Sequence, residues 1–197
     1  SVRVQHEPAG GPAANRSTVS ASPDQSGTFT ITGVVPGRFR LSASVSPPGP
    51  DSTWATLSSQ VDGQEALVTP FEIRADRQPS SVVVTLTDKP AEVSGKLVDP
   101  ADRPVAGMTV ALFPTDRTKW VANSSRVNRT TRSGADGTYR FASTLPGEYY
   151  LVVLADLDSN VWSDPAVKDQ LVTAAVKIVV AKSEKKTLDM KLPGGGR

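Results

Sequence analysis

One pattern of residues occurs twice in this chain, at positions 110 residues apart. The first copy is GTFTITGVVPGRFRL at residues 27–41, and the second is GTYRFASTLPGEYYL at residues 137–151. Farther along, Ile73 and Leu86 correspond to Ile178 and Met190, so the repeating unit is roughly 105 residues long. An internal repeat of this length restricts the fold to two related units in tandem.

Both units alternate apolar and polar residues with a period of two, which is typical of half-buried strands. Residues 38–45 (RFRLSASV) show this alternation clearly. The dipeptides Pro36-Gly37 and Pro146-Gly147 predict type II turns. Short strands separated by turns about every 8–12 residues predict an all-β fold of two tandem antiparallel β-sandwiches.

The repeat also predicts domain boundaries and cores. We expect a first sandwich at residues 1–89, a second at residues 90–192 and a Gly-rich tail at residues 193–197. The predicted core of the first sandwich is Phe29, Ile31, Phe39, Leu41, Val84 and Leu86. The predicted core of the second is Val93, Leu97, Val110, Leu112, Tyr139, Phe141, Tyr149, Leu151, Ile178 and Leu188.

One short helix is predicted in the second sandwich. Asp164 can act as its N-cap and Pro165 as its first residue, and the helix should end near Val172. The strand at residues 149–155 is apolar on both faces, so something must cover its outer side. The helix follows directly in sequence, and we expect it to be that cover.

The second unit contains five characteristic segments: VSGKLVD at 93–99, DRPVAG at 102–107, VAL at 110–112, DGTYRF at 136–141 and LPGEYYL at 145–151. Through these segments it resembles the carboxypeptidase regulatory-like domain family. It extends well over residues 91–192 and partly over residues 1–88. The resemblance implies a transthyretin-like or immunoglobulin-like sandwich of about seven strands that serves as a spacer, assembly or accessory module, common in secreted and envelope-associated bacterial proteins. It implies no catalytic residues and no peptidase activity.

The first unit departs from this pattern because it lacks an opening strand. In the second unit, residues 93–99 precede the strand at 109–113, whereas the counterpart of that second strand in the first unit already begins at Val2. A missing strand exposes unpaired backbone groups beside an apolar groove. We expect the open edge at Val2, Arg3, Val4 and Gln5.

Three sources could fill this edge: residues that precede Ser1 in a longer polypeptide, a neighbouring copy, or a rearrangement within the domain. Trimming of the sequence or misalignment of the repeats is the alternative explanation of the gap. The sequence starts at Ser1 without an initiating Met or a basic and apolar leader, so we expect a processed chain or a piece of a longer one.

Composition argues against most enzyme chemistry. The chain has no Cys and a single His, His6, which excludes disulfides and thiol chemistry and disfavours Ser-His-Asp and multi-His schemes. We therefore expect no enzyme activity and no cofactor. The net charge of +2 is spread along the chain, and no apolar run is long enough to span a membrane, so neither nucleic-acid binding nor membrane insertion is predicted.

Three groups of residues are weaker site candidates. Asp156, Asp158 and Asn160 alternate as in a calcium loop, but Val161 and Val167 stand where an EF-hand needs Gly and Glu, so a polar loop without metal is the expectation. Exposed aromatic rings can stack on sugars, although most Trp residues pack over a core. The candidates for stacking are Trp54, Trp120 and Trp162. Three N-x-S/T sequons, at Asn15, Asn123 and Asn128, are candidates for glycosylation, against ordinary polar loops.

These observations favour a structural protein. We expect an assembly module of an extracellular fibre or a multi-module surface protein. Its partners would be neighbouring copies of itself or adjacent modules of a longer chain, joined by β-strand addition. A carbohydrate-binding accessory module that holds glycans through exposed Trp is the alternative.

Overall fold

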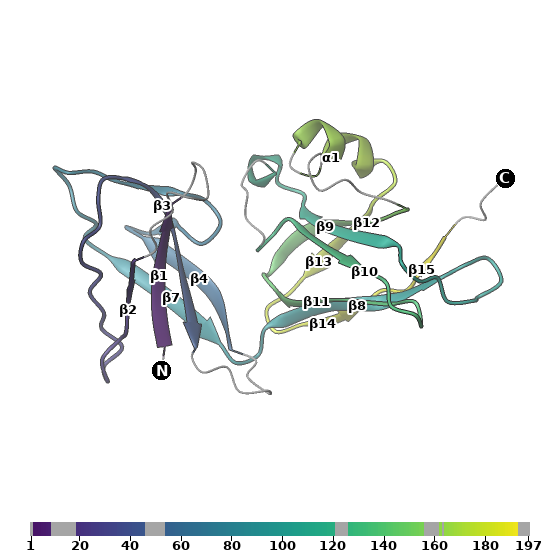
Figure 1. Ribbon diagram of the computed structural model, residues 1–197, viewed down its shortest axis with the longest axis horizontal. Helices are drawn as coiled ribbons and strands as arrows, with labels where there is room; N and C mark the ends of the chain where they lie inside the picture. The colour runs from purple at the N-terminus through teal and green to yellow at the C-terminus, as the bar shows by residue number, and fades with distance from the viewer. Residues whose placement is uncertain are drawn as a thin grey trace. The chain divides into compact units, whose positions relative to one another are not determined.

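The computed structural model describes the backbone of residues 2–8 and, with side chains, residues 19–45, 54–120, 126–155, 162 and 164–192. Most of its elements are strands (Figure 1), which confirms the predicted all-β class. The chain divides into two compact units, which we call unit 1 (Ser1–Lys89) and unit 2 (Pro90–Arg197). The predicted tail at 193–197 lies outside the described residues.

Unit 2 is a sandwich of two sheets. The first sheet is antiparallel and has the order β10-β9-β12-β13, with strands β9 (Thr109–Pro114), β10 (Arg129–Arg132), β12 (Gly147–Leu154) and β13 (Val176–Val180). The second sheet places β8 between β11 and β14, with strands β8 (Ala91–Val98), β11 (Thr138–Thr144), β14 (Lys185–Thr187) and β15 (Met190–Lys191). Strand β11 is antiparallel to β8, whereas β14 and β15 run parallel to it. This parallel pairing differs from the prediction of antiparallel strands throughout.

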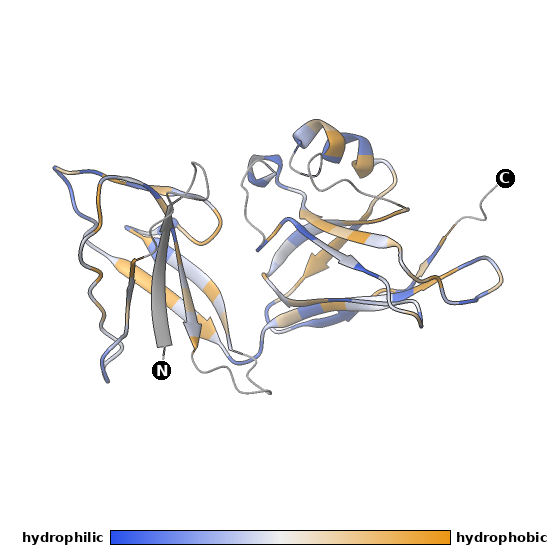
Figure 2. Cartoon of the chain, viewed as in Figure 1, coloured by the Kyte–Doolittle hydropathy of each residue, from blue (hydrophilic) through white to orange (hydrophobic). Residues whose placement is uncertain are grey.

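The core of unit 2 follows the predicted alternation (Figure 2). Nine of the ten predicted residues are buried, namely Val93, Leu97, Val110, Leu112, Tyr139, Phe141, Tyr149, Leu151 and Ile178. Leu188 is half-buried. The apolar outer face of β12 packs in a second cluster with Ala111, Phe113 and Trp120.

Helix α1 (Pro165–Val172) begins and ends as predicted. The Asp164 carboxylate accepts a hydrogen bond of 2.8 Å from the Ala166 amide, as an N-cap does. Leu171 and Val172 pack against the cluster on the outer face of β12. The helix therefore covers this face, as predicted.

Unit 1 also has two sheets. The first is antiparallel with the order β2-β1-β3-β6, and its strands are β1 (Val2–Pro8), β2 (Val19–Ala21), β3 (Gly37–Val45) and β6 (Phe71–Ile73). The second has the order β5-β4-β7, and its strands are β4 (Ala55–Val61), β5 (Gln64–Glu65) and β7 (Val82–Thr87). Of the predicted core, Phe39 and Leu41 are buried. Phe29, Ile31, Val84 and Leu86 are half-buried.

The strand registers relate the two units residue by residue. Ala43 of β3 pairs with Val4, and Val153 of β12, 110 positions later, pairs with Val110. Val110 is thus the counterpart of Val4 at an offset of 106, and β1 is the counterpart of β9. The described residues of unit 1 contain no counterpart of β8, as the repeat predicted.

The position of the open edge was predicted wrongly. Val4 and Gln5 pair with Ala21 and Ser20 of β2 on one side and with β3 on the other, so this segment is an inner strand. The reason is that the chain returns beside β1 as β2, just as β10 lies beside β9. The predicted type II turns are also wrong, because Gly37 and Gly147 begin β3 and β12, and neither has the φ near +80° that such a turn needs.

A close approach of the backbone makes Gly95 indispensable to β8. A Cβ atom there would overlap the carbonyl group of Leu188 and lie 2.9 Å from the Tyr139 hydroxyl. We expect Gly95→Ala to destabilise unit 2 by about 3 kcal/mol or more, because the overlap is with backbone. Gly134→Ala is the matched control, because its Cβ would come closest to the Asp136 side chain, at 3.1 Å, and would meet Thr138 only at ordinary contact distances of 3.6 and 3.7 Å. It should change stability by less than about 1 kcal/mol. Urea denaturation followed by Trp120 fluorescence measures both, and equal effects would contradict the close approach.

Two tyrosines make unit 2 sensitive to alkaline pH. Burial raises the pKa of Tyr139 and of Tyr149 to about 12, from an ordinary value of 10.0. Because the pKa is higher in the folded state, this stabilisation is complete below pH 10 and is lost as the pH rises toward 12. Tyrosinate absorbance should therefore appear together with loss of β circular dichroism. Tyr149→Phe removes one titrating group, so the free energy of unfolding should fall less steeply as the pH rises above 10. Titration of both tyrosines near pH 10 in a protein that keeps its β circular dichroism would contradict the prediction.

Candidate functional site

The candidate site begins at a turn that both units share. In unit 1 the Asp24 amide donates to the Thr28 carbonyl (2.9 Å) and the Gly27 amide to the Asp24 carbonyl (3.1 Å). In unit 2, 110 residues later, Gly134 and Gly137 make the same two bonds at 2.8 and 2.9 Å. Gly27 and Gly137 both have left-handed φ values, +85° and +77°. The chain thus leaves this turn in the same conformation in both units.

The segments that follow the turn differ in their pairing. Residues 138–144 form β11 and pair with β8. Their counterparts, residues 28–34, belong to no strand, and among the described residues no backbone hydrogen bond joins 29–34 to another segment. The backbone nevertheless stays equivalent, since Gly33 and its counterpart Ser143 both have positive φ, +74° and +54°. Residues 28–34 therefore follow the course of β11 without its partner.

Burial shows the consequence of the missing partner. Tyr139 and Phe141 of β11, which pairs with β8 in the same sheet, are 2% and 1% exposed, and Val93 and Leu97 of β8 are 0% exposed. Their counterparts Phe29 and Ile31 stay half-exposed, although both touch the core cluster of unit 1. Phe29 and Ile31 thus lie at the positions of Tyr139 and Phe141, but the described residues contain no strand that pairs beside them as β8 pairs beside β11.

Strand β7 borders the same opening from the other side. It is the terminal strand of its sheet and pairs only with β4 among the described strands. Its counterpart in unit 2, the segment of β14 and β15, pairs in parallel with β8. Val82 and Val83 at the start of β7 are 38% and 51% exposed. One edge of β7 is thus unpaired where unit 2 has β8.

Strand β4 does not occupy the place of β8. Thr56 of β4 accepts a hydrogen bond from the Ala43 amide (3.0 Å) and donates one to the Ala43 carbonyl (2.6 Å). The amide and the carbonyl of Ala43 therefore point toward β4 and away from Val4 of β1. Strand β4 thus lies on the side of β3 that is opposite β1. Among the described residues, no strand lies between residues 28–34 and β7.

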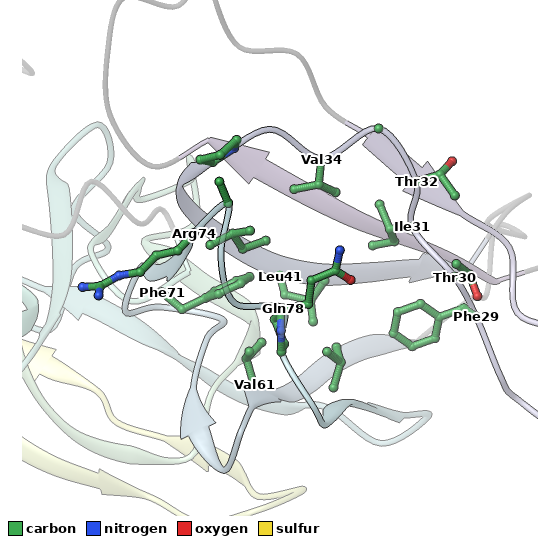
Figure 3. Close-up of a pocket in the computed structure, with 16 residues that line it drawn as sticks. Phe29, Thr30, Ile31, Thr32, Val34, Leu41, Val61, Phe71, Arg74 and Gln78 are labelled. Atoms are coloured by element: carbon green, nitrogen blue, oxygen red, sulfur yellow. The ribbon is translucent and has the colours of Figure 1, made fainter.

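A groove of about 580 Å³ occupies this space, and we call it the open groove (Figure 3). Phe29, Ile31 and Val34 line one side, and Val61 and Val82 line the other. Leu41 and Phe71 lie between them, and Gln78 adds a polar group. A smaller polar hollow of about 240 Å³ adjoins it and includes Asp62, Glu72, Arg74 and Arg77. An apolar groove flanked by unpaired backbone on both sides is suited to a β-strand.

The aromatic candidates do not form a common binding platform. Trp120 is 2% exposed, and its indole nitrogen donates to the Pro114 carbonyl at 2.6 Å, so the prediction of sugar stacking is wrong for this residue. Trp162 is half-buried and packs edge-on against Phe113. Trp54, in unit 1, is 50% exposed and stays a prediction. Trp120 and Trp162 are thus held by packing within unit 2.

Lys168 is a buried charge that the sequence did not reveal. Its side chain is among the fully buried ones, and Nζ donates to the carbonyls of Trp162 (2.7 Å) and Trp120 (3.2 Å) and lies 4.7 Å from the Trp162 ring. Burial lowers the pKa of Lys168, and the charge of Asp164 opposes this shift. The contacts join α1 to the two Trp segments, which is a structural role. A lone Lys in a short helix carries no sequence signal of such burial.

The remaining candidates fall largely outside the described residues. This applies to Asp156, Asp158 and Asn160 of the acidic loop and to Asn15 and Asn123 of the sequons. Asn128 is half-buried and its amide nitrogen donates to the Lys119 carbonyl at 2.9 Å; its glycosylation stays a prediction. The described residues contain no group of three or more His, Cys, Asp or Glu placed to hold a metal ion. Among them, no helix is long and apolar enough to cross a membrane.

The two sheets of unit 2 define it as a β-sandwich domain. Sequence comparison identifies the family. The profile of the family described as "Carboxypeptidase regulatory-like domain" matches residues 92–193, and the chain belongs to this family. No curated protein matches the chain.

Several solved structures are similar at low identity. GBS52, the minor pilin of Streptococcus agalactiae, is 12% identical, with 100% of this chain and 84% of that chain covered and a TM-score of 0.39. The shaft pilin SpaA of Lactobacillus rhamnosus GG is 10% identical, with 100% and 88% covered and a TM-score of 0.37. The dioxygenase domain of a carbohydrate-binding fusion protein from Streptomyces sp. SirexAA-E is 16% identical, with 54% and 80% covered and a TM-score of 0.35.

Hydrogen–deuterium exchange provides a test of the open groove with a control inside the same molecule. The amides of residues 29–33 should exchange at least about tenfold faster than those of residues 139–143, because only the latter are held in a ladder. The shared turn makes the two segments a matched pair. Equal protection would place residues 29–33 in a sheet and contradict the open groove.

Proposed function

We propose that this chain is a non-catalytic structural module of an extracellular or cell-surface assembly. Unit 2 is a closed sandwich, and unit 1 joins the neighbouring module by accepting a β-strand in the open groove. The single observation that carries this proposal is the contrast between β11, which pairs with β8, and residues 28–34, which have no such partner strand among the described residues. The extracellular setting comes from the family resemblance in the sequence.

Energetics support a filled groove. An unpaired backbone group in an apolar setting costs about 1–3 kcal/mol. Among the described residues, the backbone of 29–34 and the outer edge of β7 have no ladder partner, and this cost applies to those of their groups that the groove shields from water. A domain holds only about 5–15 kcal/mol of net stability, so several unpaired groups beside half-exposed Phe29 and Ile31 form a large fraction of it. Strand addition satisfies both the backbone and the apolar surface in one step.

A peptide with the sequence of residues 90–99, which contains β8, tests whether the groove accepts a strand. When it is added to the whole chain, we expect the amides of 29–33 and of β7 to gain protection of about tenfold or more. The protection of residues 138–144 should not change, because these residues already pair with β8 of their own unit.

The matched control is the same peptide carrying Val93→Asp and Leu97→Asp, which places charges on two of its buried positions. This control should give no protection. If neither peptide protects the groove at any concentration and the chain remains an inert monomer by light scattering, strand addition is not the function of unit 1.

A further inference from the structure

We infer that the strand accepted by the open groove is a segment joined covalently in front of β1, running antiparallel to residues 28–34 and parallel to β7. This inference rests on the proposed function and specifies its partner. The orientation follows from unit 2, where β8 is antiparallel to β11 and parallel to β14 and β15. The equivalent turns and registers of the two units transfer that arrangement to unit 1.

Chain connectivity selects this source. In unit 2 ten residues, 99–108, connect the end of β8 to the start of β9. Arg3 of β1 pairs with Ser44 of β3, and its counterpart Thr109 pairs with Leu154 of β12, so β1 starts within one residue of the place where β9 starts in its sheet. A strand joined in front of β1 by about ten residues would reach the groove by the route that β8 uses.

The residues that border the groove determine which sequence fits. Every second residue of β8 faces inward: Ala91, Val93, Gly95 and Leu97 are all buried. By the register of β11 with β8, Ile31 would lie opposite the Val93 position and Phe29 opposite the Gly95 position. The partner should therefore have small, apolar, small and apolar residues at alternate positions.

The outward row adds a second constraint. In unit 2, Arg140 of β11 forms an ion pair with Glu92 of β8. In unit 1 the counterpart of Arg140 is Thr30, and its outward neighbours Thr28 and Thr32 are also exposed and uncharged. The outward positions of the partner strand thus need no acidic residue, and Thr or Ser would pair well there.

A fusion protein tests the source directly. A copy of residues 90–107 replaces Ser1, so that it continues into Val2 with the spacing of unit 2. We expect the amides of 29–33 and of β7 to gain at least about tenfold protection, and unit 1 to unfold at a higher urea concentration. Residues 138–144 report whether unit 2 is intact, so a folding defect is recognised.

Two variants of the copied segment each introduce two Asp residues. One carries Val93→Asp and Leu97→Asp, at inward positions, and should lose the protection. The other carries Ser94→Asp and Lys96→Asp, at outward positions, and should keep it. Equal behaviour of the two variants would overturn the predicted alternation.

A third fusion places the same copy after Leu192, at the other end of the described chain. If this fusion or the free peptide closes the groove and the fusion in front of β1 does not, the covalent source is wrong while strand addition stands. If protection of the unmodified chain increases with its concentration, a second copy is the occupant, which also overturns the inference. If no strand from any source protects the groove, the proposed function itself fails.

Discussion

The rest of the structure depends on one strand that is paired along both edges. In unit 2, β8 bonds to β11 on one side and to β14 and β15 on the other, and its inward side chains are buried. Gly95 lets its backbone approach Leu188 so closely that no other residue fits. In unit 1 the two flanking segments have the same course, and the described part of the chain has no such strand between them. The open groove therefore corresponds to the position that β8 occupies in the sheet of unit 2.

The sequence allowed the repeat, the strands and the helix to be predicted, because these depend on local patterns. The gapless match of residues 27–41 to 137–151 corresponds to identical turn hydrogen bonds in the structure. The alternation along β11 and β12 correctly indicated Tyr139, Phe141, Tyr149 and Leu151 as core. Asp164 and Pro165 fixed the start of α1, since capping requires only neighbouring residues.

Features that depend on distant partners could not be predicted. The missing strand was inferred correctly, yet the vacancy was assigned to the edge of β1, because strand count does not determine strand order. The parallel pairing of β8 with β14 and the burial of Trp120 and Lys168 are set by segments far apart in the chain. Pro-Gly was expected to form a turn, but Gly37 and Gly147 serve instead as the first residues of β3 and β12.

The segment between β3 and β6 distinguishes unit 1 from unit 2 and bears on the proposal that unit 1 accepts a strand. Unit 2 uses the equivalent region for α1, which covers β12, whereas unit 1 uses it for β4 and β5. Strand β4 pairs with one edge of β7 along its length and leaves only the other edge exposed to the groove. An exposed sheet edge with no such restriction invites indefinite growth. Because β4 borders β7 on one side and residues 28–34 border the groove on the other, the proposed partner would be a single strand, as β8 is in unit 2.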